Sequence, residues 1–272
     1  MQPIGVFDSG YGGLTVLKEI IARLPLYDYI YLGDNARTPY GTRSFDTVYH
    51  YTLQCVEWLF SKGCPLIILA CNTASAKALR TIQQVDLPKG NPDRRVLGVI
   101  RPTSEVIGKL TAAKQVGILA TNGTVQSGSY LLEIEKFFPE VQVFQEACPM
   151  WVPLIENNEH KGQGADYFVE KHLAGLLSQS AAIDVILLAC THYPLLQEKI
   201  QQFIPPHIHL VSQGAIVAAS LADYLQRHAG MEERITRKAR RFFYTTDAAQ
   251  GFDKQAGLFF GQRVNAAQVS LQ

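Results

Sequence analysis

The chain has few cysteines, and they are not arranged as in a cross-linked or zinc-binding protein. Its five cysteines, spread over 272 residues, form no Cys-x-x-Cys pair and no even set. Close cysteine pairs are typical of zinc sites, and even sets are typical of disulfide frameworks. The sequence therefore predicts free thiols in a reducing compartment, without a metal site or structural disulfides.

An excess of one charge and a long apolar run are also absent. Lys and Arg total 25 against 24 Asp and Glu, so the net charge of +1 gives no electrostatic basis for binding nucleic acid or an anionic membrane. No apolar run approaches the length of a membrane span, and no basic start with a long apolar segment precedes the first strand pattern. We expect a cytoplasmic protein with a small-molecule partner, and neither a nucleic-acid nor a membrane partner.

Two similar stretches each end in a thiol. Residues 66–70 are an apolar run that stops at Cys71, and small polar residues follow. Such a run predicts a buried strand, and open α/β sheets bind ligands at the carboxyl ends of their strands. The pattern recurs at residues 185–189 before Cys190, again with Leu-Ala-Cys followed by a polar residue. Two strands are thus predicted to deliver one thiol each to a ligand site.

Strand and helix patterns alternate along the whole chain, and the length favours two domains. Residues 116–119 resemble residues 4–7, which indicates either an ancient duplication or chance similarity between buried strands. Because the alternation continues to the end, we expect the tail to return to the first sheet. The predicted domains are residues 1–97 together with 211–272, carrying Asp8 and Cys71, and residues 98–210, carrying Cys190 and His192.

Two carboxylates stand out. Asp8 ends the first predicted strand, where a buried carboxylate needs a proton donor or a cation as partner. The glycine-rich turn after it, Gly10-x-Gly12-Gly13, is not the dinucleotide fingerprint, and is either a ligand loop or a tight turn needed for packing. Glu156 ends an apolar segment that contains two prolines, so we expect it to face inward, although a lone glutamate is usually solvated.

The remaining patterns have structural interpretations. Residues 124–138 are predicted to form one helix, and residues 242–246 a strand followed by an amphipathic helix to residue 260. The basic run at residues 232–241 has helical spacing and no aromatic platform, which indicates a solvated helix face and not a nucleic-acid contact. Cys55 and Cys64 are predicted to be core residues.

Three functions compete for the two thiols. With Asp8 beside one, and His192 and Glu156 beside the other, they can remove a proton from one face of a carbon and return one to the other, without a cofactor. Alternatively, one cysteine is a nucleophile with His192 as its base, as in a hydrolase or amidotransferase. The third alternative is a ligand-binding protein with structural thiols. The paired Leu-Ala-Cys arrangement favours the first.

The sequence resembles the glutamate branch of the cofactor-independent aspartate/glutamate racemase family. The matching motifs extend over nearly the whole chain in family order. They are Phe7-Asp8-Ser9-Gly10-Tyr11-Gly12-Gly13-Leu14, Pro39-Tyr40-Gly41, Cys71-Asn72-Thr73-Ala74-Ser75, Cys190-Thr191-His192-Tyr193-Pro194-Leu195 and Phe243-Tyr244-Thr245-Thr246.

The resemblance implies two flavodoxin-like three-layer α/β domains related by pseudo-twofold symmetry, with the active site in the cleft between them. It implies an isomerase that interconverts L- and D-glutamate and so supplies D-glutamate for peptidoglycan biosynthesis, with no cofactor and no metal. Family members are often dimers, which makes a homodimer a candidate assembly. The alternatives are a racemase of aspartate or another amino acid, and a non-catalytic amino-acid-binding protein.

The resemblance also implies roles for individual residues. Cys71, assisted by Asp8, would take the Cα proton of D-glutamate, and Cys190, assisted by His192 with Glu156 behind it, that of L-glutamate. The positions that match substrate-binding residues are Asp8, Ser9, Tyr40, Gly41, Asn72, Thr73, Thr124, Thr191 and His192.

One segment departs from the family pattern. Many members read Val-Asp-Ser-Gly-Ala before the late helix, whereas this chain reads Val211-Ser212-Gln213-Gly214-Ala215. Since the catalytic motifs are unchanged, we expect the departure to affect only the cap of that helix or the hinge between the domains.

Overall fold

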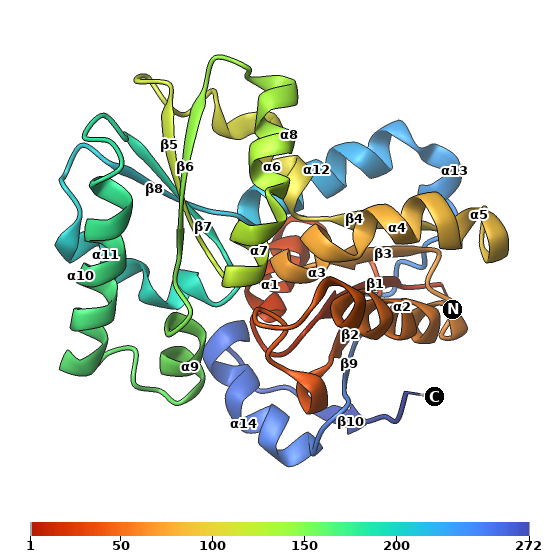
Figure 1. The fold of residues 1–272 in the computed structure, drawn as a ribbon. Coiled ribbons are helices and arrows are strands. Elements are labelled where there is room, and N and C mark those ends of the chain that lie inside the picture. Colours follow the sequence, from red (N-terminus) through yellow and green to blue (C-terminus); the bar gives the residue numbers. More distant parts are fainter. Residues whose placement is uncertain (1, 272) are drawn as a thin grey trace.

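The structure, a computed structural model, describes residues 2–271, which form two parallel β-sheets with helices on their faces (Figure 1). The first sheet has the order β10 (Ala266–Gln268), β9 (Arg241–Thr245), β2 (Tyr29–Gly33), β1 (Ile4–Asp8), β3 (Leu66–Leu69) and β4 (Arg95–Gly98). The second has the order β6 (Gln142–Ala147), β5 (Gln115–Ala120), β7 (Val185–Ala189) and β8 (His209–Ser212). The predicted α/β fold with two sheets is confirmed.

The two sheets share one strand order. The run β2-β1-β3-β4 of the first sheet corresponds to β6-β5-β7-β8 of the second, and every pairing is parallel. In both sheets the order reverses beside the first strand, as in flavodoxin-like folds, and ligands bind outside the carboxyl ends of the strands at that reversal. The fold therefore points to two places, the ends of β1 and β3 and the ends of β5 and β7.

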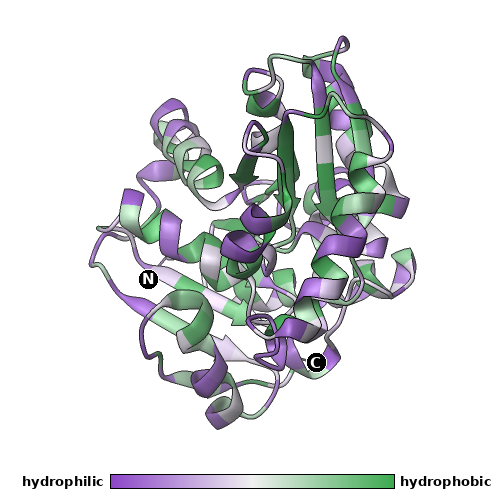
Figure 2. Ribbon diagram, turned by 90° about the vertical axis from the view of Figure 1, so that its left-hand side faces the viewer, coloured by the Kyte–Doolittle hydropathy of each residue, from purple (hydrophilic) through white to green (hydrophobic). Residues whose placement is uncertain are grey.

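The central strands are buried on both faces, which explains their continuous apolar runs. All residues of β1, β3 and β7 are buried, and Figure 2 shows that strands of both sheets are predominantly hydrophobic. The register places Phe7 beside Leu32 on one side and Leu69 on the other. The chain segments that follow β1 and β3 therefore leave the sheet side by side.

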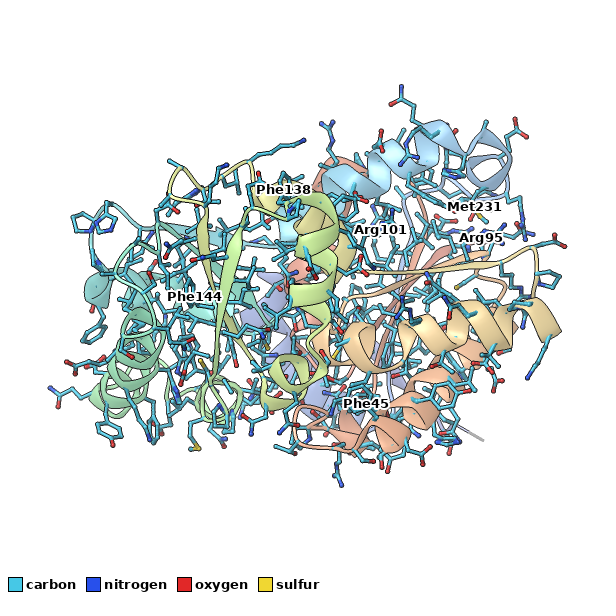
Figure 3. The ribbon with its side chains drawn as sticks, turned by 45° about the horizontal axis from the view of Figure 1, so that its top comes forward. Phe45, Arg95, Arg101, Phe138, Phe144 and Met231 are labelled. Carbon is cyan, nitrogen blue, oxygen red and sulfur yellow. The ribbon has the colours of Figure 1, made fainter. Side chains whose placement is uncertain are left out.

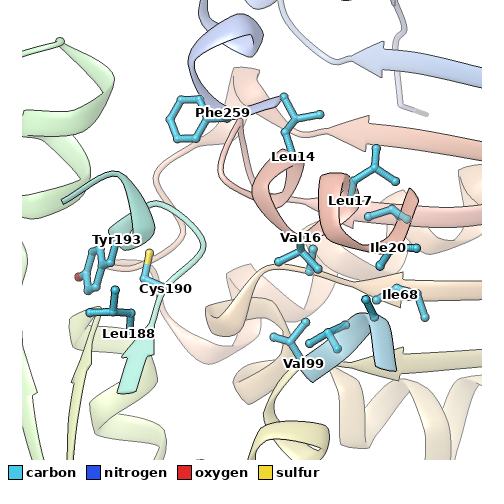
Figure 4. Packing of buried hydrophobic residues seen from close by; sticks show 14 of the residues in the cluster. Leu14, Val16, Leu17, Ile20, Ile68, Val99, Leu188, Cys190, Tyr193 and Phe259 are labelled. Atoms are coloured by element: carbon cyan, nitrogen blue, oxygen red, sulfur yellow. The ribbon is translucent and has the colours of Figure 1, made fainter. Parts of the chain in front are cut away.

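Helices cover both sheets, and their apolar side chains form three clusters. One cluster runs from α1, α12 and α14 across to the second sheet. Figure 4 shows Leu14 and Leu17 of α1 together with Leu188 of β7 and with Cys190 and Tyr193, which follow that strand. Each sheet with the helices that cover it is called a lobe below, and the two lobes thus share part of a hydrophobic core. The helices are α1 (Gly13–Arg23), α2 (Phe45–Ser61), α3 (Asn72–Lys77), α4 (Leu79–Thr81), α5 (Leu87–Gly90), α6 (Ile100–Ile107), α7 (Asn122–Ser127), α8 (Ser129–Phe137), α9 (Trp151–Glu156), α10 (Gln163–Leu177), α11 (Gln197–Phe203), α12 (Gly214–Arg227), α13 (Ala229–Glu232) and α14 (Ala249–Phe260).

Several predictions for the local structure are confirmed. Strand β9 pairs with β2, so the tail returns to the first sheet. All five cysteines are free and buried, and Cys55 and Cys64 belong to the core cluster of α2 and β3.

The single helix predicted for residues 124–138 is instead divided into α7 and α8, because Gly128 adopts a left-handed conformation with φ of 63°.

The helix predicted for residues 232–241 is wrong. Helix α13 ends at Glu232, and the chain then runs without a helix to β9; strand β10 was not predicted at all. The reason is Asp28, a fully buried carboxylate that accepts hydrogen bonds from the backbone N–H groups of Lys238 (3.1 Å) and Arg240 (2.9 Å). Donors two residues apart that converge on one carboxylate are incompatible with helical hydrogen bonding.

We expect Asp28→Asn to lower the free energy of unfolding by about 3 kcal/mol. The substitution removes the buried negative charge that accepts hydrogen bonds from the Arg240 guanidinium (2.7 Å) and the Thr236 hydroxyl (2.6 Å). Urea titration measures the change. The control is Asp223→Asn on α12, whose partner Arg227 is exposed and whose loss should cost less than about 1 kcal/mol. Equal effects of the two variants would show that Asp28 does not organise this segment.

The predicted domain borders fall within strands. The border at 97/98 lies in β4 of the first sheet, and the border at 210/211 lies in β8 of the second. The division of the chain into these two domains stays a prediction.

Figure 3 labels Phe144 of β6 in one lobe, and Arg95 of β4 with Met231 of α13 in the other. Within residues 2–271, no helix is both long enough and apolar enough to cross a membrane.

Candidate functional site

The two thiols lie where the carboxyl ends of the two sheets meet. Asp8 ends β1, Cys71 comes shortly after β3, and Cys190 follows β7 directly. The Thr191 hydroxyl donates a hydrogen bond to Asp8 Oδ1 (3.4 Å), and the Thr15 hydroxyl donates one to the Thr191 carbonyl (2.9 Å). The two strand ends, which belong to different sheets, are therefore in direct contact at the places that the strand order indicates.

Cys71 is a buried thiol at the beginning of α3. Its Sγ accepts a hydrogen bond from the Ala74 N–H (3.4 Å) and lies 3.4 Å from the Ser9 hydroxyl. Burial raises the pKa of the Cys71 thiol to about 12, and negative charge on Asp8 and Cys190 acts in the same direction. Cys71 is thus held in its protonated form, which can donate a proton.

Asp8 is a fully buried carboxylate beside that thiol. Its Oδ2 accepts a hydrogen bond from the Gly10 N–H (2.9 Å), which the tight turn after β1 aims at it. Burial raises the pKa of Asp8, while the positive charge of His192 opposes that rise. The carboxylate therefore lies within electrostatic reach of groups from both lobes.

Cys190 has an imidazole partner. His192 Nδ1 is 3.9 Å from Cys190 Sγ, and His192 Nε2 is 2.9 Å from Glu156 Oε1, so both ring nitrogens face acceptors. Burial alone would lower the pKa of His192, but the hydrogen bonds to Cys190 and Glu156 outweigh it and raise that pKa to about 10. An imidazolium in this position stabilises negative charge on the Cys190 sulfur.

The raised pKa of His192 predicts a pH dependence of stability. The pKa is about 10 in the folded protein against an ordinary value of 6.5, so protonated His192 stabilises the folded state. This contribution is complete below about pH 6.5 and is lost as the pH rises toward about 10. The free energy of unfolding of the wild type minus that of His192→Gln, measured in urea, should fall across this range. A constant difference across this range would refute the prediction.

Several of the predicted substrate-binding residues line the same junction. Thr73 of α3 and Thr121 of the second lobe have their hydroxyls 2.9 Å apart, and the Thr121 hydroxyl donates to that of Thr124 (3.2 Å). The Gly123 N–H donates to the Gly41 carbonyl (2.8 Å), which ties the loop after β2 to the second lobe. Small hydroxyl and backbone groups from both lobes thus meet at this junction.

The side chain of Tyr40 has another partner. Its hydroxyl donates to Asp34, whose carboxylate also pairs with Arg37 (2.7 Å) and accepts from Thr246 (2.8 Å). The Tyr40 ring is buried in the cluster of α2 and β3. The structure therefore brings the loop that carries Tyr40 and Gly41 to the site, while the Tyr40 hydroxyl supports the fold of that loop.

Two features of the site were not predicted. Thr121 links Thr73 to Thr124, and its place at the end of β5, which corresponds to β1, could have indicated it. Gly12 packs directly against the second lobe, since a Cβ there would lie 2.2 Å from Thr191 Oγ1 and 2.4 Å from His192 Nδ1. The glycine-rich turn after Asp8 is therefore needed for close approach of the two lobes.

The arrangement suits proton transfer from two sides. One sulfur lies beside a carboxylate and a hydroxyl, and the other beside an imidazolium backed by Glu156 Oε1 (2.9 Å). Among residues 2–271, no three or more His, Cys, Asp or Glu side chains are grouped as metal ligands would be.

Comparison with known proteins gives consistent matches over the whole chain. The sequence profile of the family described as Asp/Glu/Hydantoin racemase matches residues 5–222. A glutamate racemase of Geobacter metallireducens is 38% identical over 273 residues, which covers 100% of this chain and 97% of that protein.

Solved structures agree. A glutamate racemase isoform from Bacillus anthracis superposes with a TM-score of 0.90 at 32% identity, covering 99% of this chain and 98% of that one. The glutamate racemase of Francisella tularensis in complex with D-glutamate gives a TM-score of 0.87 at 31% identity, with the same coverage. The resemblance stated from the sequence motifs is confirmed.

Proposed function

This chain belongs to the Asp/Glu/hydantoin racemase family, an isomerase family, and we propose that it interconverts L- and D-glutamate with Cys71 and Cys190 as the two proton-transfer groups. The observation that carries the proposal is the meeting of two matching strand ends, each followed by a buried thiol, with a hydrogen bond from Thr191 to Asp8 between them. The D-glutamate complex of the Francisella tularensis relative supports glutamate as the substrate.

In the direction from L- to D-glutamate, the Cys190 thiolate removes the Cα proton and becomes a thiol. The electron pair of the broken C–H bond passes to the α-carboxylate, and the Cys71 thiol then gives its proton to the opposite face of Cα and becomes a thiolate. The product leaves with inverted configuration, and no net proton is gained or lost. The reverse direction starts from the Cys71 thiolate.

The protonation states that these surroundings favour suit the start of the first direction. The raised pKa of Cys71 keeps that sulfur protonated, as a proton donor must be. The imidazolium of His192 favours negative charge on Cys190, as a base requires. For the other direction, Asp8 is the group placed to accept the proton of the Cys71 thiol and so leave a thiolate. Glu156 holds His192 in the orientation that faces Cys190.

Small polar groups are proposed to hold the substrate. Hydroxyls, amides and backbone N–H groups can bind the two carboxylates and the ammonium group without adding a base that competes with the thiols. The residues assigned to this role are Asp8, Ser9, Tyr40, Gly41, Asn72, Thr73, Thr124, Thr191 and His192, with Tyr40 and Gly41 acting through their backbone. Because Cys71 and Cys190 are each only 6% exposed, the lobes must separate to admit glutamate.

We propose that the reaction supplies D-glutamate for peptidoglycan biosynthesis. We place it in the cytosol, where both thiols stay reduced, and the five free cysteines support this location. We also propose a homodimer on the strength of the family resemblance, which light scattering after size-exclusion chromatography tests.

The test of the function is a circular-dichroism assay of the purified protein with L-glutamate, D-glutamate and L-aspartate, in chelator and without cofactor. Both glutamate signals should decay to zero, because enantiomers are equal in free energy, and aspartate should react far more slowly. A protein that leaves glutamate unchanged but binds it in calorimetry would be a binding protein, and faster turnover of aspartate would make it an aspartate racemase.

A further inference from the structure

Gln213 lies where the chain crosses from the second sheet back to the first. It follows β8 and directly precedes α12, yet its side chain makes no capping hydrogen bond to that helix. Only 4% of the residue is exposed. A buried amide must find partners elsewhere, because an unpaired amide in the interior is costly.

Gln213 and two partners, Asn72 and Tyr130, form a closed ring of three side chains. Asn72 Nδ2 donates to Gln213 Oε1 (2.7 Å), Gln213 Nε2 donates to the Tyr130 hydroxyl (2.6 Å), and that hydroxyl donates to Asn72 Oδ1 (2.6 Å). Each member is both a donor and an acceptor, and all three are buried. The ring therefore fixes which way both amides face.

The second hydrogen of Gln213 extends the ring to the other crossing between the sheets. Gln213 Nε2 also donates to the Thr103 hydroxyl (2.9 Å) on α6, and it lies 3.3 Å from the carbonyl of Val99, a residue labelled in Figure 4. Helix α6 belongs to the segment that leads from β4 to β5. Gln213 thus joins both interlobe crossings to Asn72, the residue next to Cys71.

We propose that Gln213 is a positioning residue, which holds the Asn72 amide in the orientation that binds the substrate. This inference rests on the proposed function. The ring uses one of the two Nδ2 hydrogens of Asn72 and one lone pair of Oδ1, and leaves the other hydrogen and lone pair for a ligand. Without Gln213 the Asn72 Nδ2 group loses the acceptor that fixes its direction, and binding must order the amide again.

The first test is Gln213→Met, which keeps the length of the side chain and removes its hydrogen bonds. Asn72 is assigned to substrate binding and transfers no proton, so its loss of order should weaken binding of substrate and transition state equally. We expect KM for glutamate to rise about tenfold while kcat changes less than about threefold. The loss of kcat/KM should be equal for both enantiomers, because an equilibrium constant of one makes their two values of kcat/KM equal.

Tyr130→Phe is the second variant and is the safer one for folding. It removes the hydroxyl that orients Asn72 Oδ1 and should raise KM in the same way. The double variant should be no worse than the stronger single variant, since both changes open the same ring. The control is Tyr29→Phe, which removes a buried hydroxyl that donates to the Leu24 carbonyl (2.9 Å) at the other end of the first sheet. It should lower the melting temperature and leave KM unchanged.

A wild type that racemises glutamate, together with folded variants whose KM stays within twofold of it, would overturn the role of Gln213 and leave the proposed function intact. If Gln213→Met does not fold, an unchanged KM in Tyr130→Phe overturns that role in the same way. A wild type inactive on glutamate would instead refute the proposed function on which the inference rests.

Discussion

Cys71→Ser and Cys190→Ser should each lose racemase activity by a factor of at least about 10³ in both directions. A serine hydroxyl is a far weaker acid than a thiol and cannot serve as base or acid in the same position. Because a full turnover needs one proton taken and another delivered, removal of either sulfur stops both directions. The circular-dichroism assay with each enantiomer measures the loss.

The two variants should differ in the half-reaction that they retain. In D₂O, Cys71→Ser keeps Cys190 and should exchange the Cα hydrogen of L-glutamate, whereas Cys190→Ser should exchange only that of D-glutamate. Mass spectrometry of the recovered amino acid detects the label. The control is Cys64→Ala, which changes a fully buried thiol two residues before β3 and should keep near-normal activity. Exchange of both enantiomers by one variant would contradict the assignment of one thiol to each face.

Gly12→Ala should lower kcat/KM by about 10²-fold without unfolding the protein. The backbone of Gly12 has φ of −57° and ψ of −37°, a conformation that alanine adopts readily, so the substitution causes no backbone strain. Its effect is local, because the new Cβ would lie 2.2 Å from Thr191 Oγ1 and 2.4 Å from His192 Nδ1. The His192 ring must move away from Cys190, or the lobes must move apart.

The control for this variant is Gly164→Ala in α10, where a Cβ meets nothing within 4 Å. That change should leave activity unaltered and raise stability by about 0.4 to 1 kcal/mol. Steady-state kinetics and thermal unfolding of both proteins separate loss of activity from loss of fold. Normal turnover by Gly12→Ala would mean that the contact between the turn and His192 has no part in catalysis.

The sequence predicted the parts of the fold and the site that depend on local patterns. Continuous apolar runs identified β1, β3 and β7, and the polar residue after each run identified Asp8, Cys71 and Cys190. The carboxyl ends of parallel strands collect at one edge, so strand recognition was nearly sufficient to assemble these groups.

Contacts between distant segments could not be predicted in the same way. The partners of Gln213 come from α3, α6 and α8, and nothing in the local sequence around Gln213 indicates them. Asp28 organises a segment some two hundred residues away in the chain, and its hydrogen bonds override the helical spacing of residues 232–241. Tyr40 was assigned to the site with its motif, although its hydroxyl donates to Asp34 in the structure.

The central claim is that two thiols act on opposite faces of one carbon, and the isotope content of the first product tests it most directly. Wild-type protein is incubated with L-glutamate in D₂O, and the reaction is stopped after a few per cent of conversion. The two enantiomers are separated, and mass spectrometry measures the deuterium content of each. We predict deuterium at Cα of nearly all the D-glutamate and hydrogen in the recovered L-glutamate, because Cys190 takes the proton and Cys71 delivers a deuteron. D-glutamate that carries the original hydrogen would show that one group both removes and returns the proton, and would contradict the two-thiol mechanism.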